Sequence, residues 1–165
     1  MPNVPTVEKV ELYHVRVPLP ATFHPSWIPG FPQRQNRFDL LRVIDSDGAE
    51  GFAAGPAMGR ERDGLGQLLG PYLLGEDATD LALVRQRVRE MGYLGWKNAW
   101  IEHAFWDLAG KRAGKPVYAL LAPELDGTPV TVKLYASTGE LKEPSARIEE
   151  CEARLAEGFD TLKLR

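Results

Sequence analysis

The sequence predicts an α+β fold, with a three-stranded antiparallel sheet followed by helices and then a short β-α-β unit. Three early segments carry the apolar patterns typical of strands, namely 6–17, 37–44 and 49–54. In 63–113 the apolar residues recur instead at helical spacing. After a turn at Asp126-Gly127 the pattern changes to strand, helix and strand. These observations predict one domain over 1–128 and a second over 129–165.

The composition of the 165 residues excludes several classes of protein. Hydrophobic residues make up 44% of the chain, which is enough for a packed core, and the formal net charge is only -3. Because no basic stripe is interleaved with aromatic residues, nucleic acid is not an expected partner. The N-terminus lacks a secretory leader pattern, and no apolar run reaches membrane-spanning length. The single cysteine, Cys151, excludes an intramolecular disulfide, so these features predict a soluble cytoplasmic protein.

A long loop is predicted over 21–36, after the first strand ends at Pro18-Leu19-Pro20. Prolines at 25, 29 and 32 exclude a regular helix or a central strand there. Long loops in compact domains are often lids or binding loops, although such a loop can also simply pack on its own domain. Its large side chains, which need a surface to cover, are Phe23, His24, Trp27, Ile28 and Phe31.

A hairpin follows, because Asp45-Ser46-Asp47-Gly48 is a typical turn between the strands 37–44 and 49–54. The next stretch, Gly55 to Gly59, is a second glycine-rich loop. It is not a phosphate-binding loop, because the Gly-Lys-Ser/Thr ending is absent.

The helices are predicted at 63–74, 80–91 and 97–113, with a helical turn at 117–121. Thr79 is the expected N-cap of the second helix, and Gly114 is the expected C-terminal stop of the third. Glu102 and His103 lie on the third helix and invite a catalytic interpretation. Because no partner stands at ligand spacing such as i+4, we interpret both as structural residues.

The C-terminal piece contains a strand over 130–136, a helix over 145–157 and a final strand. This order predicts a right-handed parallel crossover. The inward stripe of the helix is Ile148, Cys151 and Leu155, which makes Cys151 a core thiol without chemistry. Since a two-stranded parallel sheet cannot bury both of its faces, we expect the second domain to need further strands.

Two cations stand at the end of the final strand. Lys163 and Arg165 are two residues apart, so they point to the same face, while Leu162 and Leu164 point to the other. Two parallel cations at the C-terminal end of a strand indicate a site. By itself, however, Lys-x-Arg is also typical of a solvated strand end.

The order of these parts resembles the enolase superfamily, in particular the mandelate racemase and muconate lactonizing enzyme group. The final segment, Gly158-Phe159-x-x-x-Lys163-x-Arg165, is similar to the Gly-Phe-x-x-x-Lys-x-Lys second barrel strand of that group. Three further motifs fit in the same order: Asp47–Phe52, the helix Ala99–Lys111 with its Gly-x-Pro-Val-x-x-Leu-Leu exit at Gly114–Leu121, and Tyr135–Ser137.

The resemblance implies an α+β capping domain joined to the first two strands of an incomplete (β/α)7β barrel, with the site at the C-terminal ends of the barrel strands. It also implies abstraction of the proton α to a carboxylate, with Mg2+ stabilising an enediolate intermediate. The complete protein would be a lyase or isomerase acting on a small carboxylate, as an acid-sugar dehydratase, a racemase or epimerase, or a cycloisomerase. The resemblance also implies a homo-oligomer.

Residue by residue, Lys163 stands where the family has an auxiliary lysine, and Arg165 stands where it has the base lysine. Arg165 is a departure, because a guanidinium stays protonated at any ordinary pH. We therefore expect Arg165 to supply positive charge, while Lys163 or a residue on a later strand takes the proton. The residues expected to contact the substrate are Ser137, Phe23, His24, Trp27 and Met58.

The three carboxylate ligands of Mg2+ belong, by the same resemblance, to the third, fourth and fifth barrel strands, which this chain does not contain. We therefore expect no metal ligand in this chain and no turnover by the 165 residues alone. The alternative is a non-catalytic module that associates through its open barrel edge. Exposed strand edges and the one-sided apolar faces of Val132, Leu162 and Leu164 would favour self-association.

Overall fold

The computed structural model describes residues 4–57, 66–67, 70–94, 98–125 and 128–165. The chain forms two compact units. The first comprises Met1–Arg16 and Arg37–Thr128, and the second comprises Val17–Asn36 and Pro129–Arg165. The second unit therefore combines two segments that are far apart in the sequence.

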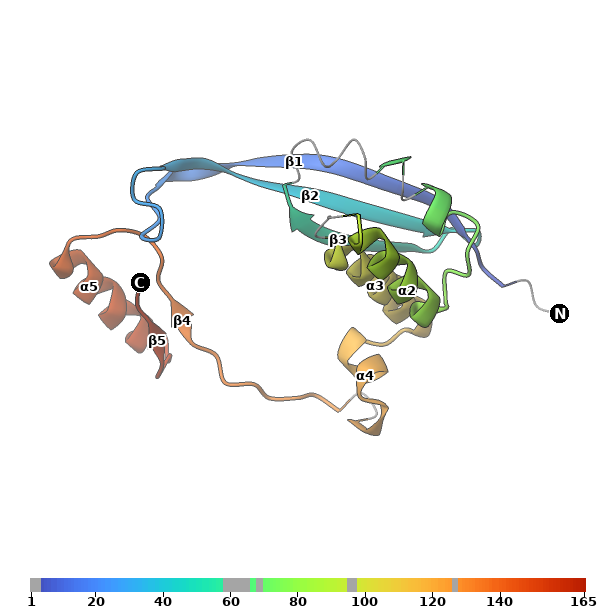
Figure 1. Ribbon diagram of the computed structural model, residues 1–165. Coiled ribbons are helices and arrows are strands. Elements are labelled where there is room, and N and C mark those ends of the chain that lie inside the picture. Colours follow the sequence, from blue (N-terminus) through green and yellow to red (C-terminus); the bar gives the residue numbers. More distant parts are fainter. Residues whose placement is uncertain (1–3, 58–65, 68–69, 95–97, 126–127) are drawn as a thin grey trace. The chain divides into compact units, whose positions relative to one another are not determined.

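A three-stranded antiparallel sheet opens the chain, as predicted (Figure 1). Its strands are β1 (Val7–Phe23), β2 (Gln33–Asp45) and β3 (Glu50–Pro56), in that order across the sheet. Strands β2 and β3 are antiparallel, with Leu41 opposite Ala53.

Two predicted strand boundaries were wrong. Strand β1 continues through Pro18 and Pro20 to Phe23, and β2 already begins at Gln33. Proline is tolerated in β1 because this strand lies at the edge of the sheet, where a missing N–H need not break a ladder. The predicted loop over 21–36 is therefore shortened to 24–32.

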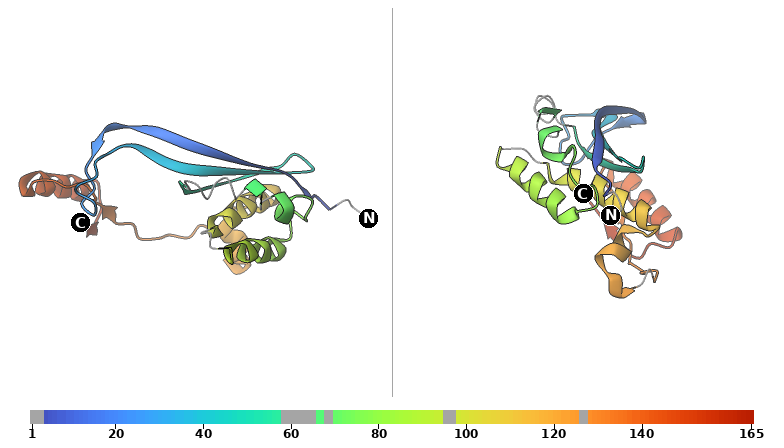
Figure 2. Two further views of the ribbon diagram at one scale, coloured as in Figure 1. Left: turned by 45° about the horizontal axis from the view of Figure 1, so that its top comes forward. Right: turned by 90° about the vertical axis from the view of Figure 1, so that its right-hand side faces the viewer.

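The main core lies between one face of the sheet and the helices α2 (Leu81–Gly92) and α3 (Glu102–Ala113), which Figures 1 and 2 show below the strands. The buried side chains of this core include Leu41, Val43, Ala53, Val84, Val88, Met91, Ile101, Phe105 and Leu108. Helix α3 crosses β3 at Gly51, where a Cβ atom would lie 1.9 Å from the carbonyl oxygen of Ala104. Only glycine permits this approach.

The predicted helix positions are close to those observed, with local corrections. The N-cap of α2 is Asp80, whose carboxylate accepts the N–H of Leu83 at 2.9 Å, and not Thr79. The third helix begins as a 3-10 turn, η1 (Ala99–Ile101), and ends as predicted at Gly114, whose φ is 62°. Helix α4 (Val117–Leu121) matches the predicted turn, and a second 3-10 turn, η2 (Pro123–Leu125), follows it.

Part of the predicted helix over 63–74 lies outside the described residues, as does Lys97. Residues 66–67 and 70–73 of that segment are helical. Among the described residues, no helix is both long enough and apolar enough to cross a membrane.

The second unit contains the predicted strand, helix and strand. Strand β4 (Ala136–Ser137) pairs in parallel with β5 (Leu162–Lys163), and α5 (Pro144–Ala156) lies between them in the sequence. The predicted strand over 130–136 was too long, because only its last residue pairs with another strand in the described part of the chain.

The prediction that Cys151 is a core thiol was wrong. Cys151 is half-buried, while its stripe neighbours Ile148 and Leu155 are 58% and 53% exposed. The stripe is apolar, but no described residue buries it. Sequence periodicity reports which face of a helix is apolar, and it does not report whether another layer covers that face.

Candidate active site at the ends of β4 and β5

Strand pairing brings Ser137 and Lys163 together. The two residues are opposite each other in the parallel β4-β5 pair. Paired residues of neighbouring strands point to the same face, so Ser137 and Lys163 share one face, and Ala136 and Leu162 share the other. Ala136 is buried and Leu162 is half-buried, whereas Ser137 and Lys163 are exposed. The face of the pair that carries Lys163 is therefore the polar one.

Both cations at the end of β5 lie against aromatic rings. The Nζ atom of Lys163 lies 5.8 Å from the ring centroid of Tyr135, and the guanidinium carbon of Arg165 lies 5.3 Å from that of Trp27. Within the described part of the chain, no carboxylate forms an ion pair with either cation. Two positive charges are thus left without an acidic partner there, which is the charge pattern of an anion-binding site.

The loop 24–32 is held against the segment that follows β4. The N–H of Ser26 donates to the carbonyl of Gly139 at 2.9 Å, and the N–H of Leu141 donates to the carbonyl of His24 at 2.7 Å. Pro25, between them, is buried. These contacts bring Trp27 of the loop to the end of the β4-β5 pair.

Thr138 fixes the backbone of Lys163. Its N–H and its hydroxyl both donate to the carbonyl of Lys163, at 2.9 and 3.0 Å, and Thr138 is buried. The sequence interpretation did not single out Thr138. Its position two residues after a predicted strand, beside Ser137, was a usable signal, because a hydroxyl group can donate a hydrogen bond to a backbone carbonyl.

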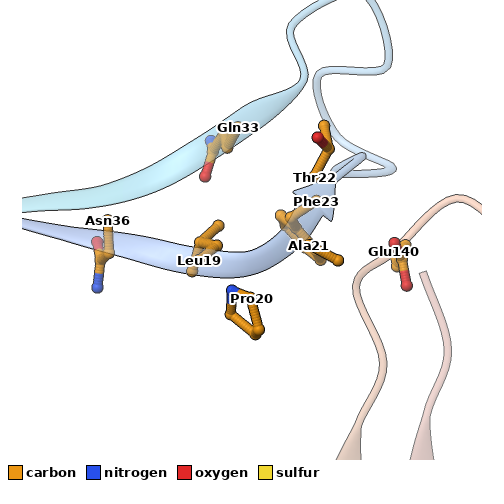
Figure 3. A pocket seen from close by; sticks show the side chains of 8 residues that line it. All are labelled: Leu19, Pro20, Ala21, Thr22, Phe23, Gln33, Asn36 and Glu140. Carbon is orange, nitrogen blue, oxygen red and sulfur yellow. The ribbon is translucent and has the colours of Figure 1, made fainter.

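A cavity of about 490 Å³ lies beside the loop, within the second unit (Figure 3). Apolar and polar side chains both line it, and Figure 3 shows Glu140 on a separate segment beside the end of β1. The lining residues are Leu19, Pro20, Ala21, Thr22, Phe23, Gln33, Asn36 and Glu140. A mixed lining of this size is typical of a small-molecule site.

The predicted site residues are brought together to different degrees. Lys163, Arg165, Ser137, Phe23 and Trp27 all lie in the second unit, and Phe23 also lines the cavity. His24 contributes its backbone carbonyl, and its side chain is exposed. Met58 lies outside the described residues. Sequence reasoning missed the contact of Tyr135 with Lys163 and that of Gly139 with the loop.

Glu102 has the contacts of a structural residue, as interpreted from the sequence. Glu102 accepts hydrogen bonds from Arg85 at 2.8 Å and from the indole N–H of Trp106 at 2.9 Å. Burial raises the pKa of Glu102, but these hydrogen bonds outweigh it and lower the pKa overall. His103 is exposed. Glu102 therefore joins α3 to Arg85 of α2.

Comparison with known proteins relates the chain to one enzyme family. The chain is 30% identical, over 105 residues, to a D-galactonate dehydratase family member from Catenulispora acidiphila, a match that covers 59% of this chain and 23% of that protein. It is 26% identical to the cis-3-hydroxy-L-proline dehydratase of Roseibium aggregatum, over 96% of this chain and 44% of that enzyme. The chain thus spans less than half the length of these curated relatives.

The fold is also shared with solved structures. The muconate lactonizing enzyme from Pseudomonas fluorescens, solved with muconolactone, aligns with a TM-score of 0.74 at 21% identity. The alignment covers 98% of this chain and 46% of that one. Finally, the sequence profile of the mandelate racemase / muconate lactonizing enzyme N-terminal domain matches residues 9–122. The chain therefore belongs to the mandelate racemase and muconate lactonizing enzyme family of the enolase superfamily, and contains its N-terminal capping domain.

Proposed function

We propose that the complete protein is an enzyme that abstracts the proton α to a carboxylate group of a small molecule, through an enediolate intermediate. The observation that carries this proposal is the position of Lys163 and Arg165, two cations without an acidic partner among the described residues, at the end of β5. A proton α to a carboxylate is very weakly acidic, so the developing negative charge has to be met by positive groups already in place.

The two cations have different roles in this proposal. Arg165 remains protonated and binds the carboxylate of the substrate or the enediolate. Lys163, or a residue on a later strand, accepts the proton, because an amine can lose its own proton when its surroundings favour it. Ser137 lies opposite Lys163 and contacts the carboxylate or hydroxyl of the substrate. Phe23, His24, Trp27 and Met58 cover its distal end.

Mg2+ is the metal that the family implies, and in the complete protein it would supply Lewis-acid chemistry. Within the described residues, however, no group of three His, Cys, Asp or Glu side chains could hold a metal ion. The described residues therefore do not form a Mg2+ centre by themselves. We propose that β4, α5 and β5 are the first unit of the (β/α)7β barrel, and that the 165 residues alone turn over nothing.

Dehydration of a hydroxy acid is the first reaction to test, because both curated relatives described above carry the name of a dehydratase. Racemisation or epimerisation and cycloisomerisation are the further members of the same class. The test is a screen of the complete protein with Mg2+ against acid sugars and N-acyl amino acids, with keto-acid formation and loss of optical rotation as readouts. Absence of turnover on the whole panel, with Mg2+ and a verified fold, would contradict the proposal.

A second candidate function is association through the open edge of the β4-β5 pair. Val132, Leu134 and Leu164 are 66%, 65% and 60% exposed, which is unusual for apolar side chains next to a strand pair. The discriminating measurement is the intact mass of the protein from its natural source. A mass near 18.4 kDa favours association with another chain, and a mass about twice that or more favours the complete enzyme.

A further inference from the structure

Trp27 is held at the tip of the loop by three groups. Its ring lies 5.8 Å from that of Phe23, tilted by 53°, and the guanidinium of Arg165 lies over it at 5.3 Å. Gly139 lies close to the same ring, since a Cβ atom added there would be only 2.9 Å from the Cζ3 atom of Trp27. The loop residue is thus fixed by its own strand, by the segment after β4, and by the cation two residues beyond β5.

We propose that Arg165 is a latch for the loop 24–32, acting through the ring of Trp27. In this role Arg165 is a positioning residue for the loop. The latch itself depends only on the contact between Arg165 and Trp27. Its link to substrate binding rests on the function proposed above.

Arginine can contact the ring of Trp27 and bind a carboxylate at the same time, and it suits this combination better than lysine. A guanidinium over an aromatic ring interacts through its charge and its flat face, and its N–H donors point outward in its own plane. Among the described residues, no acceptor takes a hydrogen bond from Arg165. Its donors therefore remain available to a carboxylate while the ring contact is kept. A lysine ammonium is compact and strongly hydrated, so it would serve one role at the expense of the other.

Lys163 provides an internal comparison. It is a cation two residues before Arg165 and also lies over a ring, but that ring belongs to Tyr135, which precedes β4 and is not part of the loop. Removal of the Lys163 charge therefore leaves the contact with Trp27 in place. Any general effect of lost positive charge should appear in both variants, whereas the latch should be lost only in the Arg165 variant.

The test is cleavage of the bond between Trp27 and Ile28 by chymotrypsin in the complete protein without substrate, with the products identified by mass. The loop contains no second favourable site, because Phe31 is followed by Pro32. Cleavage of a loop tracks the population of its open state. Arg165→Ala should speed cleavage about two- to fivefold, the range expected for one exposed cation–π contact. Lys163→Ala should leave the rate unchanged.

Gly139→Ala should disturb the contact between Arg165 and Trp27 in a second, independent way. The added methyl group displaces the ring of Trp27 but removes no charge, so it should also speed cleavage. If Arg165 acts through Trp27, the double variant should be cleaved no faster than the faster single variant. Equal rates for Arg165→Ala and the unaltered protein, equal acceleration by Lys163→Ala, or additive effects in the double variant would each overturn the latch.

The assay separates the latch from the proposed reaction. It contains no substrate, so a protein that shows the predicted cleavage rates but turns over no carboxylate retains the latch and refutes the function. A protein that turns over a carboxylate but shows no effect of Arg165→Ala on cleavage supports the function and refutes the latch. Thermal unfolding of each variant checks that cleavage occurs in the loop and not in an unfolded chain.

Discussion

At the scale of single residues, Arg165 tests the assignment of the base. If it supplies only positive charge, Arg165→Ala in the complete enzyme should raise KM about tenfold or more, as expected for loss of a charged hydrogen bond. Lys163→Ala should instead lower kcat by at least about 100-fold if Lys163 takes the proton. Steady-state kinetics with the substrate found in the screen measures both. A manyfold rise in turnover for Arg165→Lys, with the same product, would mean that position 165 is the base position after all.

Gly51 determines how closely α3 approaches β3. A Cβ atom at this position would lie 1.9 Å from a backbone oxygen and 2.8 Å from Leu108, and neither can move aside without shifting the helix. Gly51→Ala should therefore lower the free energy of unfolding by about 3 kcal/mol or more, as severe overpacking does. Gly30→Ala is the matched control, because nothing lies within 4 Å of its added methyl group. Urea unfolding of both variants checks this, and equal losses would contradict it.

At the scale of the element, the N-cap of α2 distinguishes two neighbouring residues. Asp80→Ala removes the acceptor of the Leu83 N–H and should cost about 1 kcal/mol of unfolding free energy. Thr79→Ala should cost less, because the hydroxyl of Thr79 donates to Asp77 at 2.6 Å and caps no helix N–H. Thermal unfolding of the two variants decides between them. A larger loss for Thr79→Ala would restore the N-cap predicted from the sequence.

The contacts of Glu11, with Lys9 and Tyr13 on β1 and with Arg42 on β2, predict a dependence of stability on pH. Hydrogen bonds from Lys9 and Tyr13, followed by that from Arg42, lower the pKa of Glu11 from 4.5 to about 2. Since the carboxylate form is favoured in the folded state, this stabilisation is fully present above pH 4.5 and is lost as the pH falls toward 2.

Glu11→Gln should therefore lower the free energy of unfolding at pH 6. The difference from the unaltered protein should become smaller as the pH falls from 4.5 to 2. Urea unfolding at a series of pH values measures the difference between variant and unaltered protein. Glu8→Gln is the control, because Glu8 lies on the same strand and forms no ion pair with a described residue. A difference that stays constant across the pH range would contradict the assignment.

At the scale of the whole molecule, the exposed apolar residues of the segment 130–135 predict association. If the second candidate function holds, sedimentation of the protein should show oligomers whose mass rises with concentration. Leu134→Lys should shift the equilibrium toward the monomer, because it places a charge on an exposed apolar position. Tyr13→Lys is a control at another exposed site, in the first unit. A monomer at every concentration would exclude this function.

The sequence predicted most of the fold but less of the site. Alternation and helical spacing located all three strands of the sheet, α2, α3, α4 and α5, because these patterns depend on neighbours along the chain. The prediction that Lys163 and Arg165 share one face stays a prediction, because β5 ends at Lys163 and Arg165 lies beyond it. The ends of β1 and β2 were missed, because prolines that forbid a central strand are tolerated at an edge, and edge position is not a local property.

By itself the sequence determined which residues are strand, helix and turn, which faces are apolar, and which motifs resemble an enzyme family. Only the tertiary structure decided that residues 17–36 group with 129–165, that Thr138 holds the backbone of Lys163, and that Trp27 meets Arg165. It also decided that the stripe around Cys151 is not buried. Each of these depends on contacts between residues far apart in the chain, which the closing of loops creates and no local periodicity encodes.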